Sequence, residues 1–275
     1  MSNSQCPVHR RPEDAHLPAG GASRIAAVLY GLFSYLMFLA AFVYLAGFVT
    51  GIAVPRTVDH AIEAPPVPAM IIDVGLLTAF ALQHSVMARP AFKRWWTRYV
   101  PAAIERSTYV LLASLLLVLV CWQWRSIDTV IWSVGSTPAR VGLGLLAGLG
   151  WVTAVAATFM IDHFDLFGLS QVTNFWRATP QAEKGFREVF AYRLVRHPLL
   201  LGFLIAFWAT PTMTSGHLLF AVTMTVYILV AIPIEERDLG IALGEPYQRY
   251  RERVPALVPG IARRHYGALH RRGIR

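Results

Sequence analysis

Four short polar clusters interrupt the apolar segments of this chain, and they contain the side chains best suited to chemistry. Their imidazole, carboxylate and guanidinium groups can move protons, bind anions and hold ammonium or hydroxyl groups. The four clusters are Gln83-His84-Ser85, Ile161–Asp165, Arg196-His197-Pro198 and Glu235-Glu236-Arg237. A single cluster of this kind is usually only a solvated helix end, because ionisable groups are tolerated near a membrane interface. Four clusters at the same ends of the predicted helices instead indicate a functional site.

The elements that carry these clusters are predicted to be membrane-spanning helices. Hydrophobic residues make up 55% of the 275-residue chain and charged residues 15%, whereas soluble domains carry about 25% charged residues. A helix needs about 20 apolar residues to cross the hydrocarbon core. Four segments meet this requirement: Ile25–Val49, Ala69–Ala88, Ser107–Trp124 and Val141–Ile161. We expect Asp73 to be a structural or solvated residue near the outer surface. Trp122 and Trp124 are expected to lie at the membrane interface. Close contact between helices is expected at the glycines of the fourth segment, which are Gly142, Gly144, Gly148 and Gly150.

A fifth apolar stretch, Pro198–Ile234, is too long for one membrane span. The segment Pro211–Gly216 in its middle is rich in residues that break helices. We therefore predict a hairpin of two helices of about 13 and 18 residues, the first of which is short and partly shielded from lipid. The chain as a whole is predicted to be an all-α, polytopic membrane protein with about six transmembrane helices.

The distribution of lysine and arginine predicts the orientation of these helices. Basic residues gather before the first helix, in the second and fourth connections, and after the last helix. The first and third connections carry few, so the positive-inside rule places both termini in the cytosol and the protein in the inner membrane. The net charge of +9 does not indicate a nucleic-acid partner, because the basic residues lie in short runs between apolar segments. Contact with anionic lipid headgroups explains this placement.

No metal site is predicted. The two cysteines, Cys6 and Cys121, are too few for a thiolate site or a disulfide framework. His84, His163 and His197 lie far apart in the sequence and lack the short spacing of a zinc motif. The chain also has no glycine-rich nucleotide fingerprint after a strand, which excludes a soluble methyltransferase of the Rossmann fold.

The carboxy-terminal half carries several motifs at fixed spacing. They are Arg196-His197-Pro198 with Gly202, the pair Glu235-Glu236, and Gly244 followed by Tyr247 and Tyr250. Over roughly residues 190 to 260 this pattern resembles the isoprenylcysteine carboxyl methyltransferase and phospholipid methyltransferase group. One departure is Leu200, where many members have tyrosine. The resemblance implies that this half binds S-adenosylmethionine.

The amino-terminal half resembles a different branch of the same group. Gln83–Pro90, Glu105–Leu111 and Trp122–Arg125 are similar to the NnrU-like branch, and within it Ile161–Gly168 and Phe203–Met213 most resemble the methanethiol S-methyltransferases. This resemblance covers nearly all of the chain after its leader. It implies methylation of methanethiol to dimethyl sulfide, with S-adenosylhomocysteine as the second product.

The resemblance assigns expected roles to individual residues. Arg196 and His197 would pair with the donor's carboxylate, since arginine binds carboxylates in a bidentate manner. The predicted donor-binding residues are Arg196, His197, Pro198, Gly202, Glu235, Glu236, Tyr247 and Tyr250. The thiolate is the nucleophile, so the site must accept its proton or stabilise the anion. The predicted catalytic residues are His84, Asp162, His163 and Arg196.

These roles divide the chain into four expected parts. They are a disordered cytosolic leader (1–24), transmembrane helices one to four with their loops (25–190), the donor-binding hairpin and tail (191–262), and a basic tail (263–275). The expected partners are a small thiol and membrane lipid, and the sequence gives no oligomeric state. Three alternatives stay open: a carboxyl methyltransferase for prenylcysteine or another lipid-like substrate, a non-catalytic NnrU-like membrane protein, and a transporter. No inverted repeat or discontinuous midplane helix supports the last of these.

Overall fold

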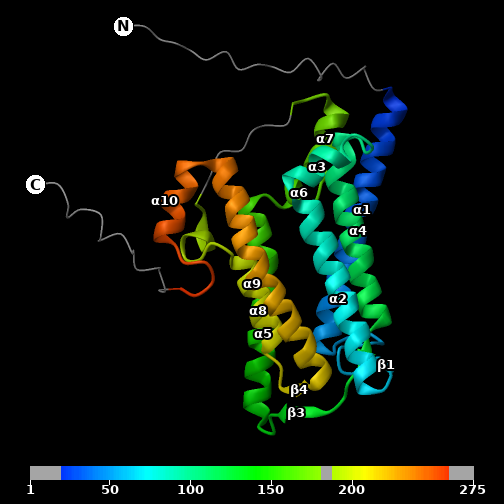
Figure 1. Cartoon of the computed structure of the whole chain (residues 1–275), viewed down its shortest axis with the longest axis vertical. Helices are drawn as coiled ribbons and strands as arrows, with labels where there is room; N and C mark the ends of the chain where they lie inside the picture. The colour runs from blue at the N-terminus through cyan, green and yellow to red at the C-terminus, as the bar shows by residue number, and fades with distance from the viewer. Residues whose placement is uncertain (1–19, 181–187, 260–275) are drawn as a thin grey trace, which may run out of the picture.

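A computed structural model describes residues 20–180 and 188–259 of the chain, which fold mainly into helices (Figure 1). The leader residues 1–19, the basic residues Lys184 and Arg187, and the tail 263–275 lie outside this description. The α-helices are α1 (Gly21–Thr50), α2 (Pro66–Ala88), α3 (Pro90–Trp96), α4 (Ala102–Gln123), α5 (Thr137–Ile161), α6 (His163–Leu166), α7 (Leu169–Arg177), α8 (Pro198–Trp208), α9 (Ser215–Leu243) and α10 (Glu245–Arg253). The remaining elements are a short 3-10 helix, η2 (Phe190–Arg193), and the strands β1 (Ile62–Glu63), β2 (Arg125–Ser126), β3 (Val130–Ser133) and β4 (Thr212–Thr214).

Five of these helices, α1, α2, α4, α5 and α9, are long and apolar enough to cross a membrane. The predicted hairpin is present as α8, an apolar helix of 11 residues, followed by α9 with 29 residues. The predicted length of about 18 residues for the second helix was wrong, because α9 continues past Ile234 through the glutamate pair to Leu243. The first helix of the hairpin is too short for a full span, as expected. The predicted all-α polytopic fold is therefore confirmed, although α1 begins at Gly21, so the last residues assigned to the leader are helical.

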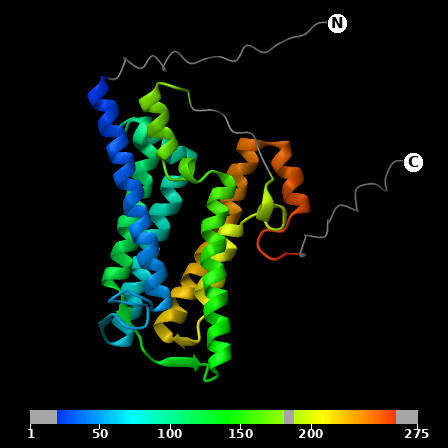
Figure 2. The ribbon, with the colours of Figure 1, turned by 180° about the vertical axis from the view of Figure 1, so that it is seen from behind.

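The helices form two groups that lie side by side (Figures 1 and 2). In one group α4 packs against both α1 and α2, and in the other α8 packs against both α5 and α9. The groups meet where α2 contacts α9, and in a shared core that includes Phe48, Trp151, Phe207 and Phe220. The edge of the Trp151 ring faces Phe42 of α1 at 5.5 Å between centroids, which joins α5 to the first group.

The contact between α5 and α8 depends on two glycines. A Cβ atom on Gly202 would lie 2.6 Å from the carbonyl oxygen of Gly150 and from the amide nitrogen of Ala154. A Cβ atom on Gly150 would meet the Gly202 carbonyl at 2.7 Å. The expectation of a glycine stripe on α5 was wrong in part, because Gly142, Gly144 and Gly148 face open space and only Gly150 makes the close contact.

The end of the molecule that carries the strands contains two short pairs of strands and several buried polar side chains. β1 pairs with β2 in parallel, and β3 pairs with β4 in antiparallel fashion. Trp124 is fully buried and donates a hydrogen bond from Nε1 to the Val58 carbonyl at 3.0 Å, so it is not interfacial as expected, whereas Trp122 is exposed. Asp73 is also fully buried and accepts a hydrogen bond from the Arg125 amide at 2.9 Å. It is a structural residue, not a solvated one.

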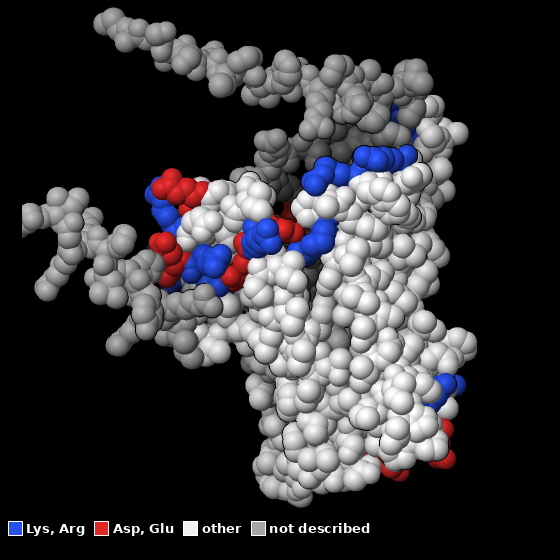
Figure 3. All heavy atoms as spheres, in the orientation of Figure 1, with Lys and Arg blue, Asp and Glu red and all other residues white. Residues whose placement is uncertain are grey.

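The sides of the long helices are apolar, and charges gather at their ends. Large exposed hydrophobic side chains occur along the outward faces of the spans, among them Leu29, Val43, Leu82, Leu145 and Val226. Figure 3 shows lysine, arginine, aspartate and glutamate side chains concentrated at the end that carries α10, with a wide uncharged band beside it. Apolar side faces between charged ends are typical of helices surrounded by lipid.

Candidate active site

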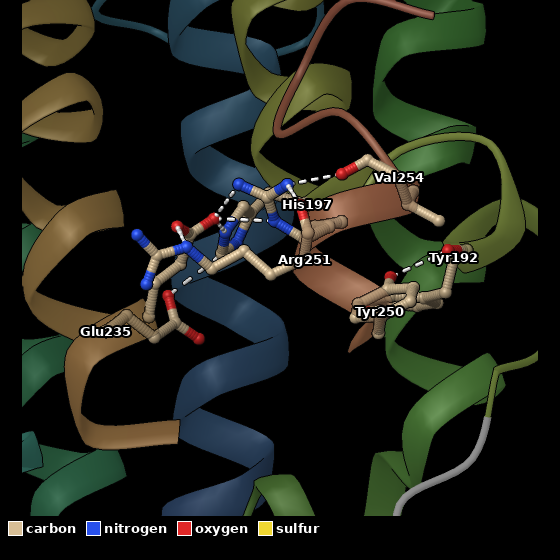
Figure 4. A network of polar contacts seen from close by, with 8 residues as sticks. Tyr192, His197, Glu235, Tyr250, Arg251 and Val254 are labelled. Carbon is tan, nitrogen blue, oxygen red and sulfur yellow. Dashed lines mark hydrogen bonds and ion pairs between the residues drawn. The ribbon is translucent and has the colours of Figure 1, made fainter. Parts of the chain in front are cut away.

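The Arg196-His197-Pro198 motif and the Glu235-Glu236 pair meet at the charged end of the molecule. Pro198 is the first residue of α8, where its missing N–H costs nothing, so Arg196 and His197 immediately precede the helix. Pro233 lies inside α9, two residues before Glu235. Because α8 and α9 are antiparallel neighbours, the start of α8 lies beside the last turns of α9, and Figure 4 shows the resulting polar network.

Arg196 ties three segments together through its guanidinium group. Nε and Nη2 both donate to Oε1 of Glu236, the first at 2.7 Å. Nη1 donates to the backbone carbonyls of Arg251 (3.0 Å) and Val254. Since a guanidinium has five N–H donors, these four hydrogen bonds leave one Nη2 hydrogen for a further acceptor. The backbone amides of Arg196 and His197 donate to the carbonyls of Pro255 and Ala256, which fixes the tail against the start of α8.

His197 lies between the two carboxylates of the glutamate pair. Its Nε2 is 3.2 Å from Oε1 of Glu236, and its Nδ1 is 3.9 Å from Oε2 of Glu235. The two glutamates differ in exposure, because the Glu236 side chain is 8% exposed and the Glu235 side chain 49%. Glu236 is thus committed to holding Arg196 and His197, whereas the Glu235 carboxylate is open to an incoming ligand.

The helix α10 closes over this network and is held by two buried tyrosines. Tyr250 donates a hydrogen bond from its hydroxyl to the Tyr192 carbonyl at 2.6 Å (Figure 4). The centre of the Tyr250 ring lies 5.9 Å from that of the Tyr247 ring. Both rings pack with Val254, Leu239 and Leu243. Burial raises the pKa of Tyr247 to about 12, with Glu236 adding to the effect, and burial likewise raises the pKa of Tyr250. Both hydroxyls therefore stay protonated at neutral pH.

Two members of the network were not predicted from the sequence. Arg251 places Nε 3.5 Å from Oε2 of Glu236, with 40% of its side chain exposed. Tyr192 contributes only its backbone carbonyl to Tyr250. Arg251 lies four residues after the predicted site residue Tyr247 on α10, so helical spacing could have indicated it. A backbone acceptor such as Tyr192 leaves no signal in residue types.

His163 and Asp162, two of the predicted catalytic residues, lie at the end of α5 and the start of α6. Nδ1 of His163 is 2.8 Å from the Thr158 hydroxyl, which itself donates to the Val155 carbonyl, so Nδ1 carries the proton. Nε2 then accepts from the Tyr35 hydroxyl at 2.8 Å. Burial lowers the pKa of His163 despite the nearby Asp162 charge. Asp162 caps α6 by accepting a hydrogen bond from the Asp165 amide at 3.0 Å.

His84, the remaining predicted catalytic residue, lies near the end of α2 in an aromatic environment. Both of its ring nitrogens are within 3.1 Å of the Tyr109 hydroxyl of α4. Its ring stacks on Phe80 at 5.4 Å between centroids. Nearby, Arg89 forms an ion pair with Asp238 at 2.8 Å, which links α2 to the same end of α9 that carries the glutamate pair. Tyr109 lies within the Glu105–Leu111 motif but was not predicted to be a site residue.

The structure therefore brings Arg196, His197, Glu235 and Glu236 into one network. His84 lies on α2, near the contact between α2 and α9. Pro198 starts α8, and the close approach at Gly202 is made by the α5 backbone. Within residues 20–180 and 188–259, no three His, Cys, Asp or Glu side chains gather as a metal site would require.

A sequence model described as "NnrU protein" matches residues 73–267, which is most of the chain. The chain belongs to the NnrU family. Together with the five apolar helices, this membership makes it an integral membrane protein. No solved structure matches the chain.

Several relatives share a single name. Methanethiol S-methyltransferase of Mycobacterium tuberculosis (strain ATCC 25618 / H37Rv) is 58% identical over 236 residues, which cover 86% of this chain and 97% of that protein. Methanethiol S-methyltransferase of Pseudomonas deceptionensis is 46% identical over 93% of this chain and 98% of its own length. Nurim of Bos taurus is more distant, at 30% identity over 66% of this chain and 70% of that protein. The predicted resemblance, and the prediction that the chain is a methyltransferase enzyme, are confirmed by these relatives.

Proposed function

We propose that this protein transfers a methyl group from S-adenosylmethionine to methanethiol, giving dimethyl sulfide and S-adenosylhomocysteine at the cytosolic face of the inner membrane. The observation that carries the proposal is the half-exposed Glu235 carboxylate beside His197, at the point where α8, α9 and α10 meet. The names of relatives that match over nearly their whole length support the choice of acceptor.

The side chains around Glu235 fit the chemistry of this donor. S-adenosylmethionine, when bound, supplies an electrophilic methyl group on a sulfonium sulfur. Glu235 would accept hydrogen bonds from its ammonium or ribose hydroxyl groups, since a carboxylate is an acceptor only. Arg251, with a partly exposed guanidinium, and the remaining Nη2 hydrogen of Arg196 would hold its carboxylate. His197 would add a ring N–H at the same edge.

The other predicted donor-binding residues would act by positioning. Glu236 holds Arg196 and His197 in place through its short contacts with both. Tyr247 and Tyr250 anchor α10, which would form a lid over the adenosine. Pro198 and Gly202 fix where α8 starts and how closely it approaches α5. Catalysis would depend on orientation, because reacting atoms held about 3–3.5 Å apart account for much of the rate gain in displacement reactions.

The membrane location suits the acceptor. A small neutral thiol partitions into the lipid and can reach the site between the helix groups without crossing open water. The charged end of the helices would face the cytosol, since it carries the basic residues of α3 and α10 (Figure 3).

The proposal is tested with protein purified in detergent and a donor labelled with deuterium on the transferred methyl group. Incubation with methanethiol should release trideuterated dimethyl sulfide into the headspace and form S-adenosylhomocysteine in equal amount. A parallel incubation with a prenylcysteine analogue should give no methyl ester. Label in the prenylcysteine ester, or no labelled dimethyl sulfide from active, folded protein, would overturn the proposal.

A further inference from the structure

A small group of polar and aromatic side chains lies where α2, α4 and α9 meet, next to the glutamate pair. His84 contacts the Tyr109 hydroxyl, at 3.0 Å from Nε2, and stacks on Phe80. The edge of the Phe80 ring meets Tyr227 of α9 at 6.5 Å between centroids. The Tyr227 hydroxyl in turn accepts a hydrogen bond from Ser85 at 3.3 Å. These five side chains, the α2–α4–α9 cluster, have no part in the donor network described above.

The cluster is bordered by two cations and one carboxylate. The guanidinium of Arg106 lies 5.1 Å above the centre of the Tyr109 ring. Arg89 donates from Nε to the Ser85 carbonyl at 3.0 Å and is paired with Asp238. Asp238 follows Glu235 by three residues on α9, a spacing that places both carboxylates on the same side of the helix. Because Glu235 also lies beside His197, the cluster and the donor network share a border.

We propose that the α2–α4–α9 cluster is the subsite for the acceptor thiol, in which His84 takes the thiol proton and the hydroxyls of Tyr109 and Tyr227 orient the sulfur. This inference rests on the proposed function. It goes beyond it by assigning the acceptor side of the reaction to named residues.

The lining of the cluster suits a small thiol. Aromatic rings make favourable contacts with divalent sulfur, typically with the sulfur about 5 Å from the ring. Phe80, Tyr109 and Tyr227 supply such rings from three different helices. The nearby guanidinium groups of Arg89 and Arg106 favour the anionic form of the thiol, as cations near a thiolate do.

The proposed step balances in atoms and electrons. A lone pair of the acceptor sulfur forms the new sulfur–carbon bond, while the bond from the methyl carbon to the sulfonium sulfur breaks and its electron pair stays on that sulfur. The thiol proton passes to an unprotonated ring nitrogen of His84 and then to water. The step uses the tautomer of His84 in which one ring N–H donates to the Tyr109 hydroxyl, because the other ring nitrogen then carries the lone pair that accepts the proton.

His84 is better placed for this step than the other predicted candidate, His163. Both ring nitrogens of His163 are engaged, one by Thr158 and one by Tyr35. Its ring is also stacked on Phe159, with centroids 4.0 Å apart. A proton acceptor needs a free lone pair near the reacting atom, which the hydrogen bonds of His163 do not leave.

The test compares His84→Gln, Tyr109→Phe and Tyr227→Phe with two matched controls. The controls are Tyr99→Phe, at a tyrosine 70% exposed, and His60→Gln, at an exposed histidine on the opposite end of the molecule. Three quantities are measured: kcat/KM for methanethiol between pH 6 and 9, the affinity for S-adenosylhomocysteine by calorimetry, and saturation transfer from donor-free protein to dimethyl sulfide by NMR.

We expect kcat/KM to fall at least tenfold in the three cluster variants, with the deficit of His84→Gln shrinking as pH rises and the thiol ionises unaided. In the same three variants, the affinity for S-adenosylhomocysteine should stay within twofold of the wild-type value. Saturation transfer to dimethyl sulfide should weaken in both tyrosine variants. The two control variants should match the wild type in all three measurements. Unchanged kcat/KM in all three variants, with the wild type active, would overturn this inference alone. Equal losses of S-adenosylhomocysteine affinity and kcat/KM would also overturn it, because the cluster would then support the donor site. An inactive wild type would overturn the proposed function and this inference with it.

Discussion

Arg196 and Glu236 are separated by 40 residues in the sequence, yet Nε of the first lies 2.7 Å from Oε1 of the second. Their side chains are only 10% and 8% exposed, and the same glutamate oxygen also contacts His197. This ion pair joins the start of α8 to the end of α9 and, through the carbonyls of Arg251 and Val254, to α10. This ion pair fixes the turn of α9 that also carries the more exposed Glu235.

Replacing Glu236 by glutamine should destabilise the protein strongly. Removal of one partner from a buried pair leaves the other charge uncompensated and costs about 3 kcal/mol or more. Thermal unfolding of the detergent-solubilised protein would show this as a lowered Tm. Glu245→Gln is the matched control, because Glu245 pairs with Arg249 on the exposed surface of α10 and its loss should cost under about 1 kcal/mol. Equal Tm values for the two variants would contradict the structural role of Glu236.

Alanine at Gly202 should force α5 and α8 apart. The new Cβ would lie 2.6 Å from backbone atoms of Gly150 and Ala154, and backbone cannot move aside as a flexible side chain can. Overpacking of this kind costs about 1–3 kcal/mol. Gly148→Ala on α5 is the control, since that position faces open space and alanine favours the helix by up to about 1 kcal/mol. A Gly202→Ala protein as stable as Gly148→Ala would show that the helices are not in contact there.

The sequence was sufficient to predict the membrane-spanning helices, because each span is a largely apolar segment and the hairpin turn is marked by Pro211 and Gly216. It did not predict the short helices α3, α6 and α7, or that α9 continues past Ile234 to Leu243. It was also sufficient to identify Arg196, His197 and the glutamate pair as members of one group. It could not show that Glu236 is buried and Glu235 exposed, since adjacent identical residues differ only in the direction they face on α9. Nor could it separate Gly150 from the other glycines of α5, or reveal that Trp124 turns inward, because both depend on the packing partner.

The stability of the protein should fall below about pH 6.5 because of His163. Burial lowers its pKa in the folded state, so the unfolded chain binds the proton more readily. The stabilising contribution is therefore present above the unfolded pKa and is lost as pH decreases. Tm measured from pH 8 to pH 5 should drop less steeply in His163→Gln than in the wild type, and His60→Gln should retain the full slope. An identical slope in wild type and His163→Gln would contradict this reasoning.

The proposed orientation can be tested by cysteine labelling. In a variant whose Cys6 and Cys121 are replaced by serine, a single Glu252→Cys on α10 should react with a membrane-impermeant maleimide only after the inner membrane is opened. Ser133→Cys in β3, at the opposite end of the helices, should react from the outside in intact spheroplasts. The reverse pattern of labelling would place the glutamate pair outside the cytosol.

The most direct test of the donor site is calorimetric titration of the purified protein with S-adenosylhomocysteine. We predict saturable binding to the wild type and about a tenfold to hundredfold weaker affinity in Glu235→Gln, because a hydrogen bond to a charged group contributes about 1.5–3 kcal/mol. Glu63→Gln, an exposed glutamate at the far end of the molecule, should bind as the wild type does. Equal affinity in Glu235→Gln and wild type, or no binding to the folded wild type, would contradict the assignment of the donor to this end of the helices.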